Sequence, residues 1–200
     1  MQSSATRALI LASTSRYRRT LLERLQLPFS VQAPGLDETP LAGEAPVALA
    51  SRLARAKAAA VSDAVPQAVV IGCDQVADLN GQALGKPGNY DNALSQLRAM
   101  RGQTVVFQTA MAVLCKETGF CEEVLVPIRV VYRDASDAEL DFYLRNEQPY
   151  DCAGSVKSEG LGIALMHSIH NDDPTALIGL PLIRLSAILG RAGIPVLGPV

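Results

Sequence analysis

The run Ala-Val-Val-Ile-Gly-Cys-Asp at residues 68–74 is the stretch that decides the fold. Its first six residues are apolar or glycine, and Val and Ile are prominent among them. An apolar run of this length and composition predicts a central strand that other elements cover on both faces. The run ends at Asp74, so the sequence predicts a carboxylate at the end of a buried strand. Ligand sites of α/β sheets collect at such positions.

Helical and strand patterns alternate on either side of this run. Further strands are predicted at residues 7–12, 29–33, 104–114, 124–132 and 161–169, and helices at residues 13–25, 46–62, 91–101, 136–145 and 181–189. Asn80-Gly81 predicts a hairpin turn after the central strand. Together these elements predict a mixed, twisted α/β sheet with flanking helices. The two long antiparallel strands at 104–114 and 124–132 argue against a purely parallel, doubly wound fold.

Length, charge and cysteine usage limit the classes of protein. The chain has 200 residues and a net charge of −2, so we expect a single domain over residues 1–200 and no long nucleic acid as partner. No apolar run approaches the roughly 20 residues that a membrane helix needs. The four cysteines form no CxxC pair, which predicts reduced thiols and a cytoplasmic location.

The stretch Ser13-Thr14-Ser15-Arg16-Tyr17-Arg18-Arg19 joins the first predicted strand to the first predicted helix. A helix N-terminus carries free N–H groups and partial positive charge, and hydroxyl and guanidinium groups complete an anion site there. The alternative interpretation is an N-cap serine followed by solvated arginines. The pattern alone leaves both open.

Two carboxylates and three lysines are further candidates for chemistry. Asp74 can hold a metal ion or activate water, and Glu38 either does the same or belongs to a capped turn. Lys57 falls on the apolar stripe of the helix at 46–62, so it either extends to the surface or enters a site. Lys86 and Lys157 lie among small residues in loops and are either solvated or directed at an anion.

Seven motifs in this order resemble the Maf family of nucleoside triphosphate pyrophosphatases. They are LASTSRYRR (11–19), LDET (36–39), ARAKA (54–58), GCDQV (72–76), LGKP (84–87), CAGSVKSEGLG (152–162) and GLPL (179–182). The resemblance covers nearly the whole chain. It implies cleavage between the α- and β-phosphates, a divalent cation (Mg²⁺ or Mn²⁺), and a Maf/ITPase-like fold with two lobes around a nucleotide cleft.

The resemblance also implies roles for individual residues. The positions that match the family's catalytic pattern are Ser13, Arg18, Glu38, Lys57, Asp74 and Lys86. Arg18, Lys57 and Lys86 would hold the phosphates, while Glu38 and Asp74 would carry the metal. Asp74 would also accept a proton from the attacking water.

Residues Tyr17, Gln75 and Glu159 concern the base, and Lys157 lies in the same substrate-binding segment as Glu159. The three are similar to the 7-methyl-GTP branch of the family and depart from it at Tyr17, where Trp is expected. N7-methylation makes guanine cationic, and an aromatic face attracts a cation by about 0.5–2 kcal/mol. The Glu159 carboxylate can accept hydrogen bonds from guanine, whereas the carbonyls of uracil and thymine would repel it.

Three alternatives remain at this stage. The same chemistry could act on dTTP, UTP or a broad nucleotide set. The chain could instead bind nucleotides without hydrolysis and regulate division, or bind a methylated RNA cap, which would require a basic groove for the following nucleotides. A homodimer is also expected of a small enzyme of this kind.

Overall fold

Seven strands form one mixed sheet in the computed structural model of the chain, which describes residues 7–198. They are β1 (Leu9–Ala12), β2 (Ser30–Val31), β3 (Val69–Leu79), β4 (Gln82–Leu84), β5 (Thr104–Cys115), β6 (Phe120–Tyr132) and β7 (Met166–His170). The order is β2-β1-β3-β5-β6-β7, and β4 pairs with β3. β1 runs parallel to β2 and β3, and the other pairs are antiparallel. The predicted mixed α/β fold is therefore confirmed.

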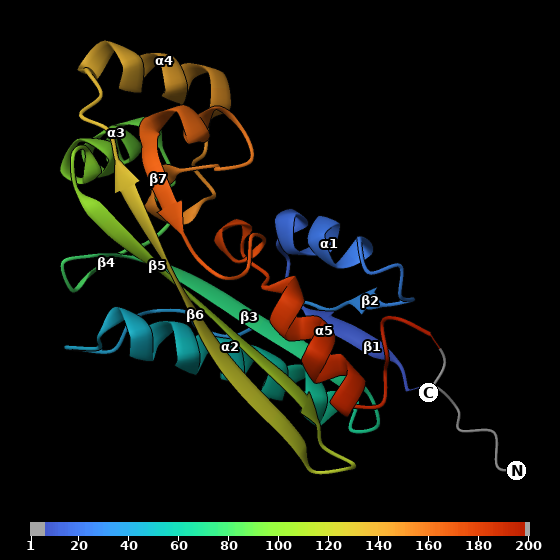
Figure 1. Ribbon diagram of the computed structural model, residues 1–200. Coiled ribbons are helices and arrows are strands. Elements are labelled where there is room, and N and C mark those ends of the chain that lie inside the picture. The colour runs from blue at the N-terminus through green and yellow to red at the C-terminus, as the bar shows by residue number, and fades with distance from the viewer. Residues whose placement is uncertain (1–6, 199–200) are drawn as a thin grey trace, which may run out of the picture.

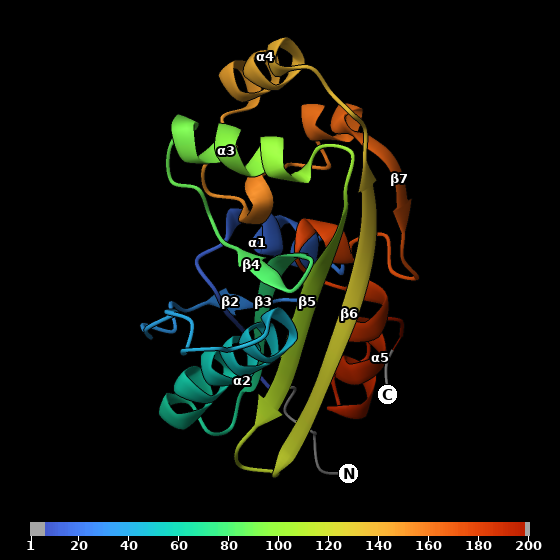
Figure 2. The ribbon, with the colours of Figure 1, turned by 90° about the vertical axis from the view of Figure 1, so that its left-hand side faces the viewer.

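Five helices and three short 3₁₀ turns pack around this sheet. They are α1 (Arg16–Glu23), α2 (Pro46–Ala64), α3 (Tyr90–Met100), α4 (Asp137–Glu147), α5 (Leu182–Arg191), η1 (Ala153–Ser155), η2 (Leu161–Leu165) and η3 (Ala176–Ile178). Figure 1 shows the long strands crossing the molecule, with α3 and α4 at one end. In Figure 2, α2 and α5 lie on opposite sides of these strands. No helix in the described part of the chain is long and apolar enough to cross a membrane.

The side chains of β1 and β3 point alternately to the two faces of the sheet. Leu11 and Ile71 pack with α1 and α5, while Ala12 and Val70 pack with α2. Gly72 faces α2 so closely that a Cβ placed there would lie 2.2 Å from the carbonyl oxygen of Ala54. A side chain at Gly72 would therefore push α2 away from the sheet.

β3 has an open stretch along one edge. β1 pairs with β3 only as far as Gly72, and β4 begins to pair at Ala77. β5 occupies the opposite edge from residue 70 to residue 78, so β1 and β4 must share the first edge. Within residues 7–198, positions 73–76 of β3 thus have no strand neighbour on that edge. Asp74 and Gln75 both lie in this opening.

The predicted end of the central strand was wrong. Asp74 lies in the middle of β3, which continues to Leu79 and turns at Asn80-Gly81 into β4, as the hairpin signal predicted. The two polar residues at 74 and 75 interrupt the apolar pattern, but pairing with β5 carries the strand through them. β6 likewise begins at Phe120, four residues before its predicted start.

The strand predicted at residues 161–169 is only half present. Residues 161–165 form η2, and β7 begins at Met166. A Cβ at Gly162 would lie 2.4 Å from the carbonyl oxygen of Lys157, because the chain folds back on itself here. This turn buries Leu165 and leaves Leu161 exposed, which an extended strand ending in the same place would not do.

Candidate active site

The opening in the edge of β3 faces a pocket of about 760 Å³. This volume falls within the range of roughly 300–1,000 Å³ that small-molecule sites occupy. Segments from the whole chain line it, including the N-terminus of α1, the loop before α2, the β4 hairpin and η3. Nine of the ten residues predicted for the site line this pocket: Ser13, Tyr17, Arg18, Glu38, Lys57, Asp74, Gln75, Lys86 and Glu159.

Lys57 joins two carboxylates at one side of the pocket. Its Nζ lies 2.6 Å from Oδ1 of Asp74 and 3.0 Å from Oε1 of Glu38. The side chains of Lys57 and Asp74 are 6% and 9% exposed, whereas that of Glu38 is 48% exposed. The buried pair is thus formed before any ligand arrives, and Glu38 closes it from the solvent side. Of the two interpretations of Lys57, the structure favours the one that directs it into a site.

The loop that carries Glu38 is fastened to α2. Arg52 donates from Nε and Nη2 to the two oxygens of Glu44, at 2.6 and 2.7 Å, and Nη2 also reaches the carbonyl of Thr39 at 3.3 Å. Oδ1 of Asp37 accepts from the backbone N–H and hydroxyl of Thr39. Asp37 thus caps a turn, as one interpretation of this segment predicted, while Glu38 lines the pocket.

Arg18 is held at the opposite side of the pocket by α1 and η3. Its Nε donates to the carbonyl of Gly179 at 2.9 Å, and Nη1 lies 3.5 Å from Oγ of Ser13. Ser15 is the N-cap of α1, as the alternative interpretation of this stretch predicted. The first turn contains no acidic residue, so its partial positive charge and Arg18 add together. This geometry suits an anion.

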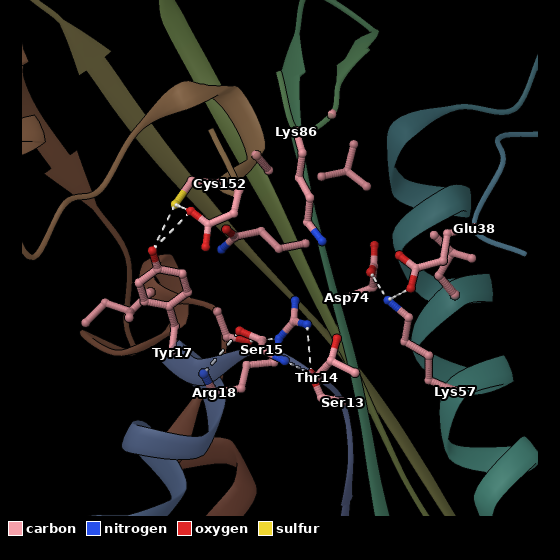
Figure 3. Close-up of a pocket in the computed structure, with 18 of the residues that line it drawn as sticks. Ser13, Thr14, Ser15, Tyr17, Arg18, Glu38, Lys57, Asp74, Lys86 and Cys152 are labelled. Carbon is pink, nitrogen blue, oxygen red and sulfur yellow. Dashed lines mark hydrogen bonds and ion pairs between the residues drawn. The ribbon is translucent and has the colours of Figure 1, made fainter. Parts of the chain in front are cut away.

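Lys86 supplies a further positive charge from the turn after β4. In Figure 3 its side chain and that of Arg18 point into the space beside Asp74. Lys86 is exposed and forms no salt bridge within residues 7–198. An anion in this space would therefore meet Arg18 and Lys86 from two segments of the chain, beside Lys57, which already pairs with Asp74 and Glu38.

Tyr17 lies at the rim of the pocket in a polar cluster. Its hydroxyl donates to Oδ1 of Asp151 at 3.2 Å and accepts from Arg16 at 2.8 Å, and the Arg16 guanidinium lies 4.8 Å from the ring centroid. Burial raises the pKa of the Tyr17 phenol well above its ordinary value, so the group remains a neutral donor. Burial also raises the pKa of the neighbouring Cys152 thiol to about 12. The cluster links α1 to the segment before η1 across the pocket (Figure 3).

Lys157 lies outside the pocket, contrary to the prediction that it faces the substrate. Its ammonium pairs with the carboxylate of Glu147 on α4, and this hydrogen bond is the largest cause that lowers the pKa of Glu147. Its backbone N–H donates to the hydroxyl of Tyr143 at 3.0 Å. The glycine-rich segment turns at this position, so Lys157 supports the loop while Glu159 lines the pocket.

The sequence did not identify the groups that hold the predicted residues in place. Asp151 carries no local signal and is placed next to Tyr17 only by the fold. Thr109 and its neighbour Gln108 interrupt an otherwise apolar stretch of β5, and a buried polar group needs a partner. That interruption was a usable signal. The carbonyls of η3 are backbone groups, which no sequence pattern marks.

The donor set suits a hard divalent cation. Asp74 and Glu38 lie close together, since each has an oxygen within 3.0 Å of the Lys57 ammonium, and both offer oxygen ligands. No group of three or more His, Cys, Asp or Glu residues that could hold a metal occurs among residues 7–198. Mg²⁺ is usually bound by one or two carboxylates together with water and substrate phosphates, so two carboxylates are sufficient.

Comparison with known proteins identifies a family model and relatives that match this chain. Residues 8–192 match the family described as Maf-like protein. A relative from Polaromonas sp. is 63% identical over 94% of this chain and 86% of its own length. Another, from Albidiferax ferrireducens, is 60% identical over 99% of this chain and 100% of its own length. Both are named 7-methyl-GTP pyrophosphatase. The solved structure of the Staphylococcus aureus Ham1 protein aligns with a TM-score of 0.47 and 14% identity, covering 78% of this chain and 90% of that one.

Proposed function

The chain belongs to the family of Maf-like proteins, and on that premise we propose that it hydrolyses 7-methyl-GTP to 7-methyl-GMP and pyrophosphate. The main observation behind the proposal is that two chemically different groups of residues line one pocket. Cations and carboxylates gather around Asp74, while Tyr17, Gln75 and Glu159 offer an aromatic face and acceptors. A triphosphate suits the first group, and a methylated guanine suits the second.

The phosphates bind to the cationic side of the pocket. A triphosphate carries about four negative charges near neutral pH, whereas the chain as a whole has a net charge of −2. Binding therefore depends on local charge, which Arg18, Lys57 and Lys86 provide together with the N-terminus of α1. Phosphoryl transfer requires mainly positioning and stabilisation of charge, and these groups supply both.

Asp74 removes the proton from the attacking water. Its Oδ1 accepts from Lys57, while Oδ2 has no hydrogen-bond partner among the described residues and is not sealed from solvent. As the water oxygen forms its bond to the α-phosphorus, the water's proton passes to Oδ2 of Asp74. The P–O bond that bridges the α- and β-phosphates then breaks, and pyrophosphate leaves with the bonding electrons. Lys57 holds the carboxylate in position throughout.

Glu38 and Asp74 would hold a divalent cation, Mg²⁺ or Mn²⁺, together with phosphate oxygens. Such an ion would neutralise negative charge on the phosphates. Glu38 is the more exposed of the two carboxylates, so its side chain would be free to turn toward an incoming ion. Lys57 would then keep Asp74 as its remaining partner.

The base binds between Tyr17, Gln75 and Glu159. Arg16 covers one face of the Tyr17 ring, so a base that stacks on Tyr17 uses the other face. The cationic ring of 7-methylguanine gains about 0.5–2 kcal/mol from such a contact. Its N1–H and exocyclic amine are adjacent donors, which match the acceptors of Gln75 and Glu159.

The test is pyrophosphate release from 7-methyl-GTP, GTP, dTTP, UTP and CTP, with Mg²⁺, with Mn²⁺ and with a chelator. Fastest release from 7-methyl-GTP that depends on the metal supports the whole proposal. Preference for dTTP or UTP would retain the reaction and overturn the base assignment. Tight binding of the nucleotides without release would favour a nucleotide-binding regulator instead.

Glu159→Gln is expected to reduce the preference for 7-methyl-GTP over UTP by about tenfold. The change removes a charged acceptor from the base, and a hydrogen bond to a charged group contributes about 1.5–3 kcal/mol. The measurement is the ratio of kcat/KM for the two substrates. Glu117→Gln is the matched control, because Glu117 is an exposed carboxylate paired with Arg7 outside the pocket. An unchanged ratio in Glu159→Gln would show that Glu159 does not contact the base.

Two further expectations from the sequence belong to the proposal. The substrate is a nucleotide of the cell interior and the four cysteines are free thiols, which supports a cytoplasmic location. The homodimer stays a prediction, and sedimentation of the purified protein at several concentrations tests it.

A further inference from the structure

The side-chain amide of Gln75 has only one orientation that its surroundings allow. Its Nε2 lies 2.8 Å from Oγ1 of Thr109 and 3.0 Å from the carbonyl oxygens of both Ala176 and Leu177. A carbonyl oxygen accepts hydrogen bonds and cannot donate them. The NH₂ group must therefore face η3, since the reverse orientation would place Oε1 against two other oxygens.

The hydroxyl of Thr109 reinforces this orientation. Thr109 is fully buried and pairs with Gln75 across β5 and β3. Its Oγ1 donates to the carbonyl of Ala176 at 3.1 Å, so toward Gln75 it can only accept. Thr109 and the carbonyls of Ala176 and Leu177, which we call the amide clamp, thus take up both hydrogens of the Gln75 NH₂ group.

The amide clamp is rigid because a buried carboxylate holds η3 in place. Asp173 is 1% exposed, and its Oδ1 accepts from the hydroxyl of Thr175 at 2.8 Å. Its Oδ2 accepts from the backbone N–H of Ile183 at 2.8 Å, which ties η3 to the start of α5. The carbonyls that face Gln75 are consequently fixed by contacts that lie outside the pocket.

We propose that the amide clamp makes Gln75 a hydrogen-bond acceptor toward the ligand, and that Thr109 is a specificity-determining positioning residue. The inference rests on the proposed function for the identity of the base. With its NH₂ group occupied, Gln75 presents only Oε1 to the pocket, and Oε1 accepts no hydrogen bond from the described residues.

This polarity selects among bases. The edge of guanine that carries N1–H and the exocyclic amine offers two adjacent donors to acceptors such as Oε1 and the Glu159 carboxylate. Uracil and thymine place a carbonyl oxygen on each side of their single N–H, so an acceptor that cannot rotate into a donor repels them. A freely rotating glutamine would instead adapt to either edge.

The first test compares Thr109→Val with Thr109→Ser. Val keeps the volume and loses the hydroxyl, whereas Ser keeps the hydroxyl and loses a buried methyl group. Val places a methyl group where Oγ1 lies 2.8 Å from Nε2, so the Gln75 amide must also move away from the carbonyls of Ala176 and Leu177. The amide clamp therefore predicts that Val lowers the 7-methyl-GTP to UTP ratio of kcat/KM about fivefold, mainly through KM, and that Ser stays near wild type. A residue important only for packing would give the reverse order, because the methyl group is what Ser removes.

The second test observes the Gln75 side-chain amide directly and does not depend on enzymatic activity. Exchange of the Gln75 side-chain NH₂ hydrogens with solvent is measured by NMR on ¹⁵N-labelled protein. We expect protection in the wild type and in Thr109→Ser, and exchange at least tenfold faster in Thr109→Val. Fast exchange in the wild type, or equal substrate ratios in Val and Ser, would overturn the clamp. Slow exchange in a protein that releases no pyrophosphate would support the clamp and contradict the proposed function.

Discussion

Asp74→Asn is expected to lower turnover of 7-methyl-GTP by about 10²- to 10⁴-fold, the usual contribution of a general base. Asparagine has nearly the same shape and still accepts a hydrogen bond from Lys57, but its amide cannot take a proton from water. Nucleotide binding should therefore persist, since Arg18 and Lys86 are unchanged. Pyrophosphate release gives the rate, and titration calorimetry with 7-methyl-GTP gives the affinity.

Stability must be followed in the same variant, because Lys57 is buried and loses its charged partner. Removing one member of a buried ion pair costs about 3–5 kcal/mol, although Glu38 remains as a second partner here. Asp78→Asn is the matched control. Asp78 lies on the same strand, accepts from Gly81 at 2.7 Å and does not line the pocket. Near-normal turnover in a folded Asp74→Asn protein would end the assignment of Asp74 as the base.

Gly72→Ala is expected to destabilise the fold strongly. The new Cβ would lie 2.2 Å from the carbonyl oxygen of Ala54 and 2.5 Å from the amide nitrogen of Ala58, both backbone atoms of α2. Relief requires α2 to move away from β3, at a cost of about 3 kcal/mol or more. For a chain of this size, that lowers Tm by roughly 6–12 °C. Lys57 travels with α2, so activity should also fall.

Gly190→Ala provides a control of opposite sign. Gly190 lies within α5 and has nothing within 4 Å of the position where a Cβ would stand. Alanine is favoured over glycine in a helix by about 0.5–1 kcal/mol, so Tm should rise by a few degrees. Thermal unfolding followed by circular dichroism measures both variants. A Tm for Gly72→Ala within 2 °C of wild type would show that α2 can yield at this point.

The helices were predicted closely from the sequence, and strand ends were not. The spacing of apolar residues predicted α2 at residues 46–62, and the capping signal at Ser136 predicted the start of α4, where the capping box is present. Strand ends depend on which neighbour pairs, and pairing partners are distant in sequence. Asp74 and Gln75 therefore resembled the end of a strand. They lie instead in the middle of β3, just beyond the last residue that pairs with the neighbouring strand β1.

The candidate site was predictable where the chemistry resides in side chains. Asp74, Glu38 and Lys57 meet as the resemblance implied, because each lies in a motif of its own. Lys157 was misplaced because its partner, Glu147, lies on a helix that gave no sign of an interaction with that loop. The amide clamp was out of reach for a different reason, since two of its three acceptors are backbone carbonyls whose position depends on η3.

The open edge of β3 sets the spacing between two residues of the proposed site. Asp74 and Gln75 are consecutive residues, so their Cα atoms are about 3.8 Å apart and their side chains leave the strand on opposite faces. No hinge or loop lies between Gln75, which we propose contacts the base, and Asp74, which we propose activates water. In the proposed reaction, the spacing between the contact to the base at Gln75 and the contact to the water at Asp74 is therefore set by one extended backbone.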